Sequence, residues 1–222
     1  KVMNKITLYK WAAKHNAAEV VHEALQPAIR FSKAQCLDLP PVLTTTREVP
    51  LTPQQHKYYE KLRQDMLVRA AGEEITVVNA AASMNKLLQL SGGAVYSDTG
   101  EIIEFDAGNR LSVLKEVIDE SSHKVLVFVP YRHTIQLVSQ HLAKEGITSE
   151  IINGDVSARE RGEIFSRFQT SENPRVLVIQ PQSASHGVTL TSANTVVFWS
   201  PVMSVETYLQ CIARIDRVGQ KN

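Results

Sequence analysis

The chain has 222 residues, which is enough for one sizeable domain or for a domain with an appendage. Its formal net charge of +1 excludes a protein that attracts nucleic acid through an overall positive field, so any such binding must come from a local surface. The two cysteines, Cys36 and Cys211, form no CxxC pair and the seven histidines follow no zinc spacing, so we expect reduced thiols and no structural metal.

The first 108 residues predict helices joined by extended segments. Residues 11–25 follow a helical pattern, and a threonine–proline pair begins a second helix over residues 52–68. Residues 77–90 predict a third helix, which the glycine pair at 92–93 ends. We interpret residues 1–108 as a connecting segment and a helical protrusion packed on the domain that follows.

From residue 109 onward, helices and strands alternate. The predicted strands are continuous apolar runs, of the kind buried on both faces of a parallel sheet. In chain order the elements are a helix over 110–121, a strand over 124–130, a helix over 134–144, a strand over 150–152, a helix over 158–168 capped by Ser157, and strands over 175–180 and 195–199. This alternation predicts an α/β fold with a doubly wound, mainly parallel sheet and helices on both faces, over residues 109–222.

A final helix is predicted to run through the end of the sequence. It places Gln210, Arg214 and Arg217 at i, i+4 and i+7, so that all three share one face. An amide and two permanent cations on one face suit a polyphosphate, because guanidinium groups can stabilise charge on a transferring phosphoryl group. The alternative is a solvated helix face, since exposed arginines at helical spacing are common.

No segment has the length and hydrophobicity of a membrane span. The longest apolar run, over residues 125–130, is as long as a strand, and the first residues contain no apolar stretch typical of a signal peptide. We therefore expect a soluble, intracellular protein without a membrane partner, in the cytoplasm of a bacterial or virus-infected cell or in a nucleus. Neither end of the sequence has a tail-like composition, which indicates a piece of a longer chain.

Five sequence blocks occur in the order of a known family. They are residues 37–54 with Tyr59, residues 124–131, residues 153–168 with Arg161, residues 176–191, and residues 210–220. Together they resemble the second, C-terminal RecA-like lobe of the Swi/Snf-like DNA-dependent ATPases of helicase superfamily two, and they are closest to viral and bacterial members. The resemblance covers almost the whole chain and identifies residues 1–108 as an interlobe connection with a helical protrusion.

The sequence departs from the family pattern at a few positions. Ala184 and Ser185 stand where the family usually has a glycine pair, and His186 stands where an aliphatic residue is common. Asp216 replaces the usual histidine before the second arginine. Because Gly187 and both arginines persist, we interpret these departures as variation within a subgroup.

The resemblance implies a nucleotide site shared between two lobes. It assigns Arg217 as an arginine finger, Arg214 as a second contact to the γ-phosphate, and Gln210, Gly187 and Gln220 as nucleotide-binding residues. ATP and Mg²⁺ would be held mainly by an N-terminal RecA-like lobe of the same full-length chain, because this sequence contains no Gly-Lys-Ser/Thr phosphate-binding loop. The present chain alone is therefore expected to be inactive.

Nucleic acid is expected at the carboxyl edge of the sheet, where α/β sheets place their ligands. Donors in the loops after the strands suit contacts to a sugar-phosphate backbone without base readout. The candidate nucleic-acid-binding residues are Tyr131, Arg132, His133, Asn153, Gly154, Gln182, Ser183, Ser185 and Thr191. For Ser183, Ser185 and Thr191, ordinary turn chemistry is an equally good interpretation.

These features predict one lobe of an ATP-driven translocase whose partner is DNA, with double-stranded DNA favoured. One alternative is a lobe of a strand-separating DNA or RNA helicase. A second alternative is a nucleic-acid-binding or regulatory module without a motor half. A phosphate-binding loop in the rest of the protein would favour a motor over the module without a motor half.

Overall fold

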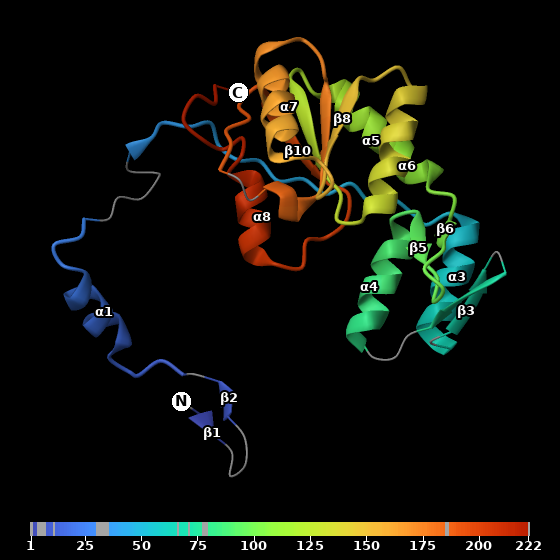
Figure 1. Ribbon diagram of the computed structural model, residues 1–222, viewed down its shortest axis with the longest axis horizontal. Coiled ribbons are helices and arrows are strands. Elements are labelled where there is room, and N and C mark those ends of the chain that lie inside the picture. The colour runs from blue at the N-terminus through green and yellow to red at the C-terminus, as the bar shows by residue number, and fades with distance from the viewer. Residues whose placement is uncertain are drawn as a thin grey trace. The chain divides into compact units, whose positions relative to one another are not determined.

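The computed structural model describes residues 2–3, 8–10, 12–29, 36–65, 67–70, 72–76, 80–184 and 187–221 (Figure 1). The chain divides into two compact units, residues 1–38 and residues 39–222. In the first unit, β1 (Val2–Met3) pairs antiparallel with β2 (Leu8–Lys10), and α1 (Ala17–Leu25) follows. The helix is shorter than predicted, because residues 12–14 have no regular secondary structure and residues 15–16 form a turn, while Trp11 lies outside the described residues.

The second unit begins with a small α/β part that includes α3 (Pro53–Asp65), α4 (Ala80–Ser91), and two hairpins. The hairpins pair β3 (Leu67–Ala70) with β4 (Glu73–Thr76), and β5 (Ala94–Tyr96) with β6 (Ile102–Glu104). The sequence predicted neither hairpin. The expected extension of the second helix to residue 68 was wrong, since the chain turns at Gly72, with φ of 84°, and pairs with itself.

Hydrogen bonds fix the start of α3. Thr52 Oγ1 accepts from the Gln55 N–H at 3.3 Å, and Gln55 Oε1 accepts from the Thr52 N–H at 3.3 Å, which is a reciprocal capping box. Gln55 Nε2 also donates to the Leu90 carbonyl at the end of α4 (3.1 Å). The small part has its own core, made of Leu62, Ile75, Leu90, Val95, Ile103 and Phe105.

A four-stranded parallel sheet in the order β10-β7-β9-β8 forms the centre of the larger part. Its strands are β7 (Lys124–Phe128), β8 (Ser149–Ile152), β9 (Val176–Ile179) and β10 (Ala193–Phe198). The helices are α5 (Gly108–Glu120), α6 (Arg132–Lys144), α7 (Ala158–Thr170) and α8 (Val205–Ile212), with a short 3₁₀ helix η1 (Pro181–Ala184) after β9.

Helices cover both faces of this sheet, as the sequence predicted (Figure 1). Leu126 and Phe128 of β7 pack with α7 and α8, whereas Val125 and Val127 of the same strand pack with α5 and α6. Successive side chains of a strand point to opposite faces, so a continuous apolar strand contributes side chains to the hydrophobic cores on both faces of the sheet. The fold is therefore the doubly wound α/β fold that the alternation of elements predicted, and it agrees with the RecA-like lobe that the family resemblance implied.

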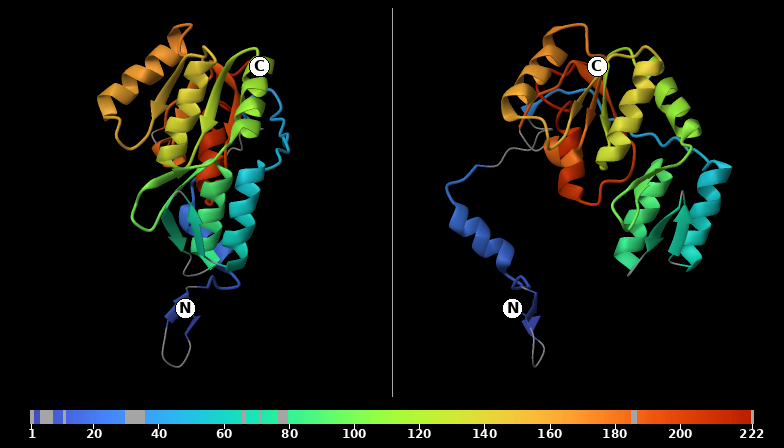
Figure 2. Two further views of the ribbon diagram at one scale, coloured as in Figure 1. Left: turned by 90° about the vertical axis from the view of Figure 1, so that its right-hand side faces the viewer. Right: turned by 45° about the vertical axis from the view of Figure 1, so that its right-hand side comes forward.

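The small α/β part meets the larger part at the carboxyl edge of the sheet. Trp199, directly after β10, donates from Nε1 to the Gly92 carbonyl at 3.0 Å. Tyr131, directly after β7, donates from its hydroxyl to Asn85 Oδ1 at 2.8 Å. Figure 2 shows the cyan and green elements of this part gathered at one end of the sheet. They therefore cover the ends of β7 and β10.

His133 lies buried in the same joint. Its Nε2 is 2.8 Å from the Ala94 carbonyl, and its ring packs edge-on against Tyr96 with the centroids 4.6 Å apart. Burial lowers the pKa of His133, and the nearby Lys86 cation lowers it further. The hydrogen bond to Ala94 opposes this change without cancelling it.

The lowered pKa makes folding sensitive to acid. The unfolded chain binds a proton at this histidine more readily than the folded chain, so the stabilisation is present above about pH 6.5 and is lost as the pH falls toward the folded-state pKa. We expect the pH dependence of the free energy of unfolding, measured by urea titration from pH 7.5 to 5.5, to be flatter in His133→Gln, by up to about 1.4 kcal/mol per pH unit. The exposed His56→Gln variant should retain the original slope. Parallel curves for all three proteins would contradict this assignment.

Candidate functional site

The segment with the two arginines is helical only in part. Helix α8 begins at Val205 and ends at Ile212, and it is capped by Ser204, whose Oγ accepts from the Thr207 N–H at 3.2 Å. Beyond this point, the chain continues in tight turns, such as the bond from the Arg217 N–H to the Ile215 carbonyl at 2.8 Å. The prediction that Gln210, Arg214 and Arg217 share one helical face was therefore wrong.

Arg214 explains where the helix ends. Its Nε donates to the Gln210 carbonyl at 2.9 Å, which in a continued helix would accept the backbone N–H of Arg214. That N–H instead bonds to the Cys211 carbonyl at 3.2 Å. The side chain thus replaces a helical hydrogen bond, and the backbone turns away.

The guanidinium group of Arg214 is enclosed in the fold. Only 6% of the residue is exposed, and Nη1 donates to the Val188 carbonyl at 3.2 Å. The Arg214 carbonyl accepts from the Leu190 N–H at 2.8 Å. Burial lowers the pKa of Arg214, and the neighbouring Arg217 cation lowers it further. In this structure Arg214 binds the 187–190 loop to the end of α8, with two of its guanidinium donors directed at backbone carbonyls.

Arg217 differs from Arg214 in its exposure. It lies on the surface, and Nη1 donates to the Gly187 carbonyl at 3.1 Å. Gly187 has φ of 63°, in the left-handed region that favours glycine, and so directs its carbonyl toward the arginine. The described residues give the Arg217 side chain this one hydrogen bond. Most of its five donors therefore remain available.

The two glutamines of this segment bind to the protein itself. Gln210 is half-buried, and its Nε2 donates to Glu206 Oε1 at 3.1 Å. Gln220 donates from Nε2 to the Ala193 carbonyl at 2.8 Å, which fastens the end of the chain to the start of β10. Gln220 therefore supports the backbone around Arg217, because its Nε2 also lies 3.4 Å from the Ile215 carbonyl, whereas Gln210 bonds within α8.

The candidate nucleic-acid residues divide into an exposed set and a buried set. Arg132 and Gly154 are exposed at the carboxyl edge, as is Gln182 in η1. Tyr131 is half-buried, and burial raises the pKa of its hydroxyl. Ser185 lies outside the described residues, as does His186.

Three of the predicted contacts are turned into the fold. His133 is the second residue of α6 rather than a loop residue, and it is buried in the joint. Asn153 is buried because its Oδ1 accepts from the Asp155 N–H at 3.0 Å, and Ser183 is buried within η1. The sequence identified their loops correctly but could not show the direction of their side chains.

Thr191 lies at the opposite edge of the sheet from the one predicted. The Oγ of its neighbour Ser192 donates to the Phe168 carbonyl at 3.1 Å, near the end of α7, and β10 begins at Ala193. A parallel strand must start at the amino edge of the sheet. The segment between β9 and β10 has therefore returned from the carboxyl edge to the amino edge before residue 191. The interpretation of Thr191 as a contact at the carboxyl edge was wrong.

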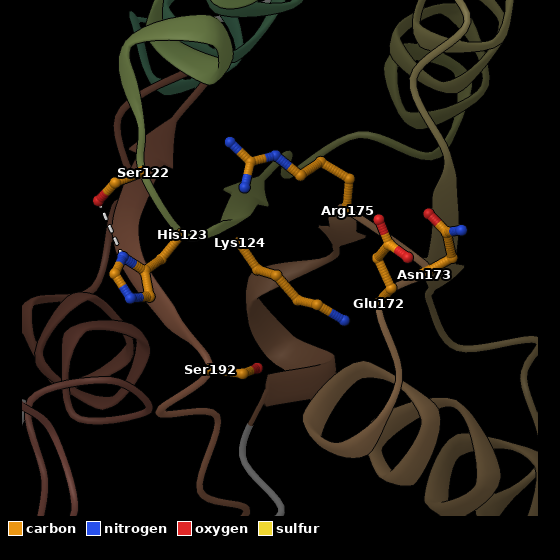
Figure 3. Close-up of a pocket in the computed structure, with 7 residues that line it drawn as sticks. All are labelled: Ser122, His123, Lys124, Glu172, Asn173, Arg175 and Ser192. Atoms are coloured by element: carbon orange, nitrogen blue, oxygen red, sulfur yellow. Dashed lines mark hydrogen bonds between the residues drawn. The ribbon is translucent and has the colours of Figure 1, made fainter.

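A cavity of about 500 Å³ opens at this amino edge, with Lys124 and Arg175 among its lining side chains (Figure 3). Lys124 donates from Nζ to the Phe168 carbonyl at 2.7 Å and the Ser171 carbonyl at 2.6 Å, at the end of α7. Arg175 donates to the Ile118 carbonyl at 3.2 Å, near the end of α5. Because cations compensate the negative carbonyl ends of helices, we interpret this cavity as part of the structural framework.

Asp155 is a residue of the carboxyl edge that the sequence analysis did not identify. Its Oδ1 and Oδ2 lie 2.9 Å and 3.1 Å from Nη1 of Arg132. A signal was available, since an acidic residue follows directly after Asn153 and Gly154 in a loop expected near Arg132. The edge therefore carries an ion pair rather than an isolated cation.

Two features are absent from the residues that the structure describes. Within that part of the chain, no group of three or more His, Cys, Asp or Glu side chains is arranged to hold a metal ion. The described helices also include none that is long and apolar enough to cross a membrane.

Comparison with known proteins gives a family match over half of the chain. Residues 109–219 match the family described as "Helicase conserved C-terminal domain". Similar proteins include the "CHD3-type chromatin-remodeling factor PICKLE" of Arabidopsis thaliana, which is 24% identical over 91% of this chain, and an "Uncharacterized ATP-dependent helicase" of Mycoplasma pneumoniae, which is 28% identical over 87%. The chain spans only 16% and 19% of the lengths of these two relatives.

A solved structure supports the fold. The "Sulfolobus solfataricus SWI2/SNF2 ATPase core domain" superimposes with a TM-score of 0.58 over 92% of this chain and 43% of that one, at 21% identity. The similarity extends beyond the sheet to most of the chain. At this identity it is evidence for the architecture alone.

The different environments of the two arginines predict different effects on stability. Arg214→Lys keeps the charge but cannot donate to two carbonyls in the same fork geometry, so it should lower the free energy of unfolding by about 1.5–3 kcal/mol. Arg217→Lys, at an exposed position, should change it by less than about 0.5 kcal/mol. Urea denaturation of both variants tests this difference. Equal stabilities would show that the Arg214 contacts do not support the fold.

Proposed function

Because the chain belongs to the family of helicase conserved C-terminal domains, as its sequence predicted, we propose that it is the second motor lobe of a Swi/Snf-like, DNA-dependent ATPase. In this proposal, an N-terminal RecA-like lobe of the same full-length protein is its partner, and the two lobes close around ATP. The motor moves along double-stranded DNA. The names of the relatives, a chromatin-remodeling factor and an ATP-dependent helicase, support this assignment.

The observation that carries the proposal is the exposed Arg217 next to Gly187. One guanidinium donor is held by the Gly187 carbonyl, and the others point to no described partner. A guanidinium group stays charged at any physiological pH and presents paired donors to phosphate oxygens. Arg217 is therefore suited to the role of an arginine finger that stabilises charge on the transferring phosphoryl group.

Arg214 has a supporting role in this proposal. By binding the carbonyls of Gln210 and Val188, it fixes the backbone from which Arg217 projects. An arginine finger works only if its position is set before the reaction, because misplacement by about 1 Å costs much of the rate. The two carbonyls use two of the five guanidinium donors, so the proposed second γ-phosphate contact by Arg214 would be made by the remaining ones.

The first lobe must supply the remaining chemistry. ATP brings the phosphoryl group and Mg²⁺ neutralises part of its charge, but this sequence contains no Gly-Lys-Ser/Thr loop to cradle the phosphates. The missing loop fits a lobe that contributes cationic groups to a nucleotide held elsewhere, and for this reason we expect no ATP hydrolysis by the 222-residue chain alone.

The nucleic-acid contacts of the proposal are confined to one half of the carboxyl edge. The small α/β part covers the ends of β7 and β10 through Asn85 and Gly92. The loops after β8 and β9 remain, and they expose Gly154 and Gln182 beside Arg132. Amide and guanidinium donors of this kind suit contacts with phosphate and sugar, which fix position without reading sequence.

Removal of Arg217 tests the catalytic assignment. In the full-length protein, Arg217→Ala should lower the DNA-stimulated ATPase rate by roughly 10³- to 10⁵-fold, which is the contribution of an arginine finger. The matched control is Arg159→Ala, which removes an exposed arginine of α7 and should leave the rate near that of the wild type. A wild-type rate in Arg217→Ala would remove the assignment. Stimulation by RNA or single-stranded DNA, but not by duplex DNA, would favour a strand-separating helicase.

A further inference from the structure

The ion pair between Arg132 and Asp155 bridges two loops that are not neighbours in the sheet. Arg132 begins α6 after β7, and Asp155 follows β8. The sheet order places β9 between these two strands. The bridge therefore crosses the carboxyl end of β9, in the part of the edge that the small α/β part leaves open.

The Asp155 carboxylate is held in position by its own loop. Its N–H donates to Asn153 Oδ1 at 3.0 Å, and Asn153 Nδ2 lies 3.4 Å from its Oδ2. Gly154 gives the guanidinium room, because a Cβ at this position would lie 2.9 Å from Nη2 of Arg132. The loop is thus shaped so that Arg132 can lie over it and meet the carboxylate.

This pair can be exchanged for another anion. The side chains of Arg132 and Asp155 are 52% and 65% exposed, and exposed ion pairs contribute little to stability and exchange readily with solvent. A phosphate group offers the same guanidinium two oxygens in a similar arrangement. A DNA phosphate and the Asp155 carboxylate therefore compete for one cation.

We propose that Asp155 occupies a phosphate subsite on Arg132 and weakens the binding of nucleic acid at this edge. This inference rests on the proposed function, which places nucleic acid at the carboxyl edge. When a backbone phosphate binds Arg132, the carboxylate moves into solvent, and its negative charge opposes the phosphate. The ion pair makes each contact with DNA weaker, which suits a lobe that must release one phosphate before it binds the next.

The test compares two variants that lose the same charge. Asp155→Asn removes the competing carboxylate. Glu150→Gln instead breaks the partly exposed ion pair between Glu150 of β8 and Arg167 of α7. Fluorescence anisotropy of the full-length protein with a labelled 20-base-pair duplex at several salt concentrations gives the dissociation constants. We expect Asp155→Asn to bind roughly 3- to 10-fold more tightly at low salt, and Glu150→Gln to bind like the wild type.

The salt dependence and a double variant identify the cation responsible. One additional phosphate contact steepens the slope of log affinity against log salt by about 0.9 for duplex DNA. In Arg132→Gln/Asp155→Asn, the affinity gained by Asp155→Asn should disappear relative to Arg132→Gln alone. A gain that persists without Arg132 would overturn the inference, as would an equal gain in Glu150→Gln.

The remaining outcomes separate this inference from the proposed function. If the wild type binds duplex DNA and Asp155→Asn binds with the same affinity and slope, the competing role of Asp155 is overturned while the proposed function stands. If neither protein binds DNA, both are overturned. Thermal unfolding of each variant, which should match the wild type because the pair is exposed, excludes an effect of misfolding on these results.

Discussion

The buried guanidinium group of Arg214 holds together the segments on which the proposed function depends. It donates to the carbonyl of Gln210, which belongs to α8, and to the carbonyl of Val188, which belongs to the loop before β10. It therefore joins these two segments. A buried cation is costly unless it is hydrogen-bonded, so the loss of these two bonds would destabilise the segment. The same contacts that end α8 also bring Gly187 to Arg217. The two arginines of this segment therefore lie in different environments, Arg214 buried and Arg217 exposed.

The amino edge and the carboxyl edge of the parallel sheet differ in the groups that they present. At the amino edge, Lys124 and Arg175 line a cavity and compensate the carbonyl ends of helices, so these two cations support the fold. At the carboxyl edge, the small α/β part covers one half through its contacts with Tyr131 and Trp199. The other half is crossed by the ion pair of Arg132 with Asp155. A ligand that lies along the edge is therefore directed to the loops after β8 and β9.

The sequence was most informative where burial alone decides the structure. The apolar strand over residues 124–130 had to be covered on both faces, and its helices lie where the alternation predicted them. The family and the RecA-like lobe followed from the order of the motifs, and the family match supports them.

Prediction failed where a tertiary contact competes with local propensity. Arg214 ends a helix whose pattern continues to residue 217, and the turn at Gly72 converts part of a helical pattern into a hairpin. The inward direction of Asn153 could not be predicted, because its partner is a backbone group of its own loop.

The most direct test of the account is a structure of the full-length protein with a non-hydrolysable ATP analogue. The account predicts that Arg217 lies within hydrogen-bond distance of the γ-phosphate, about 3 Å. It also predicts that Arg214 keeps its bonds to the carbonyls of Gln210 and Val188. A structure in which Arg214 has left these carbonyls to bind the phosphate, or in which Arg217 points away from the nucleotide, would contradict the division of roles between the two arginines.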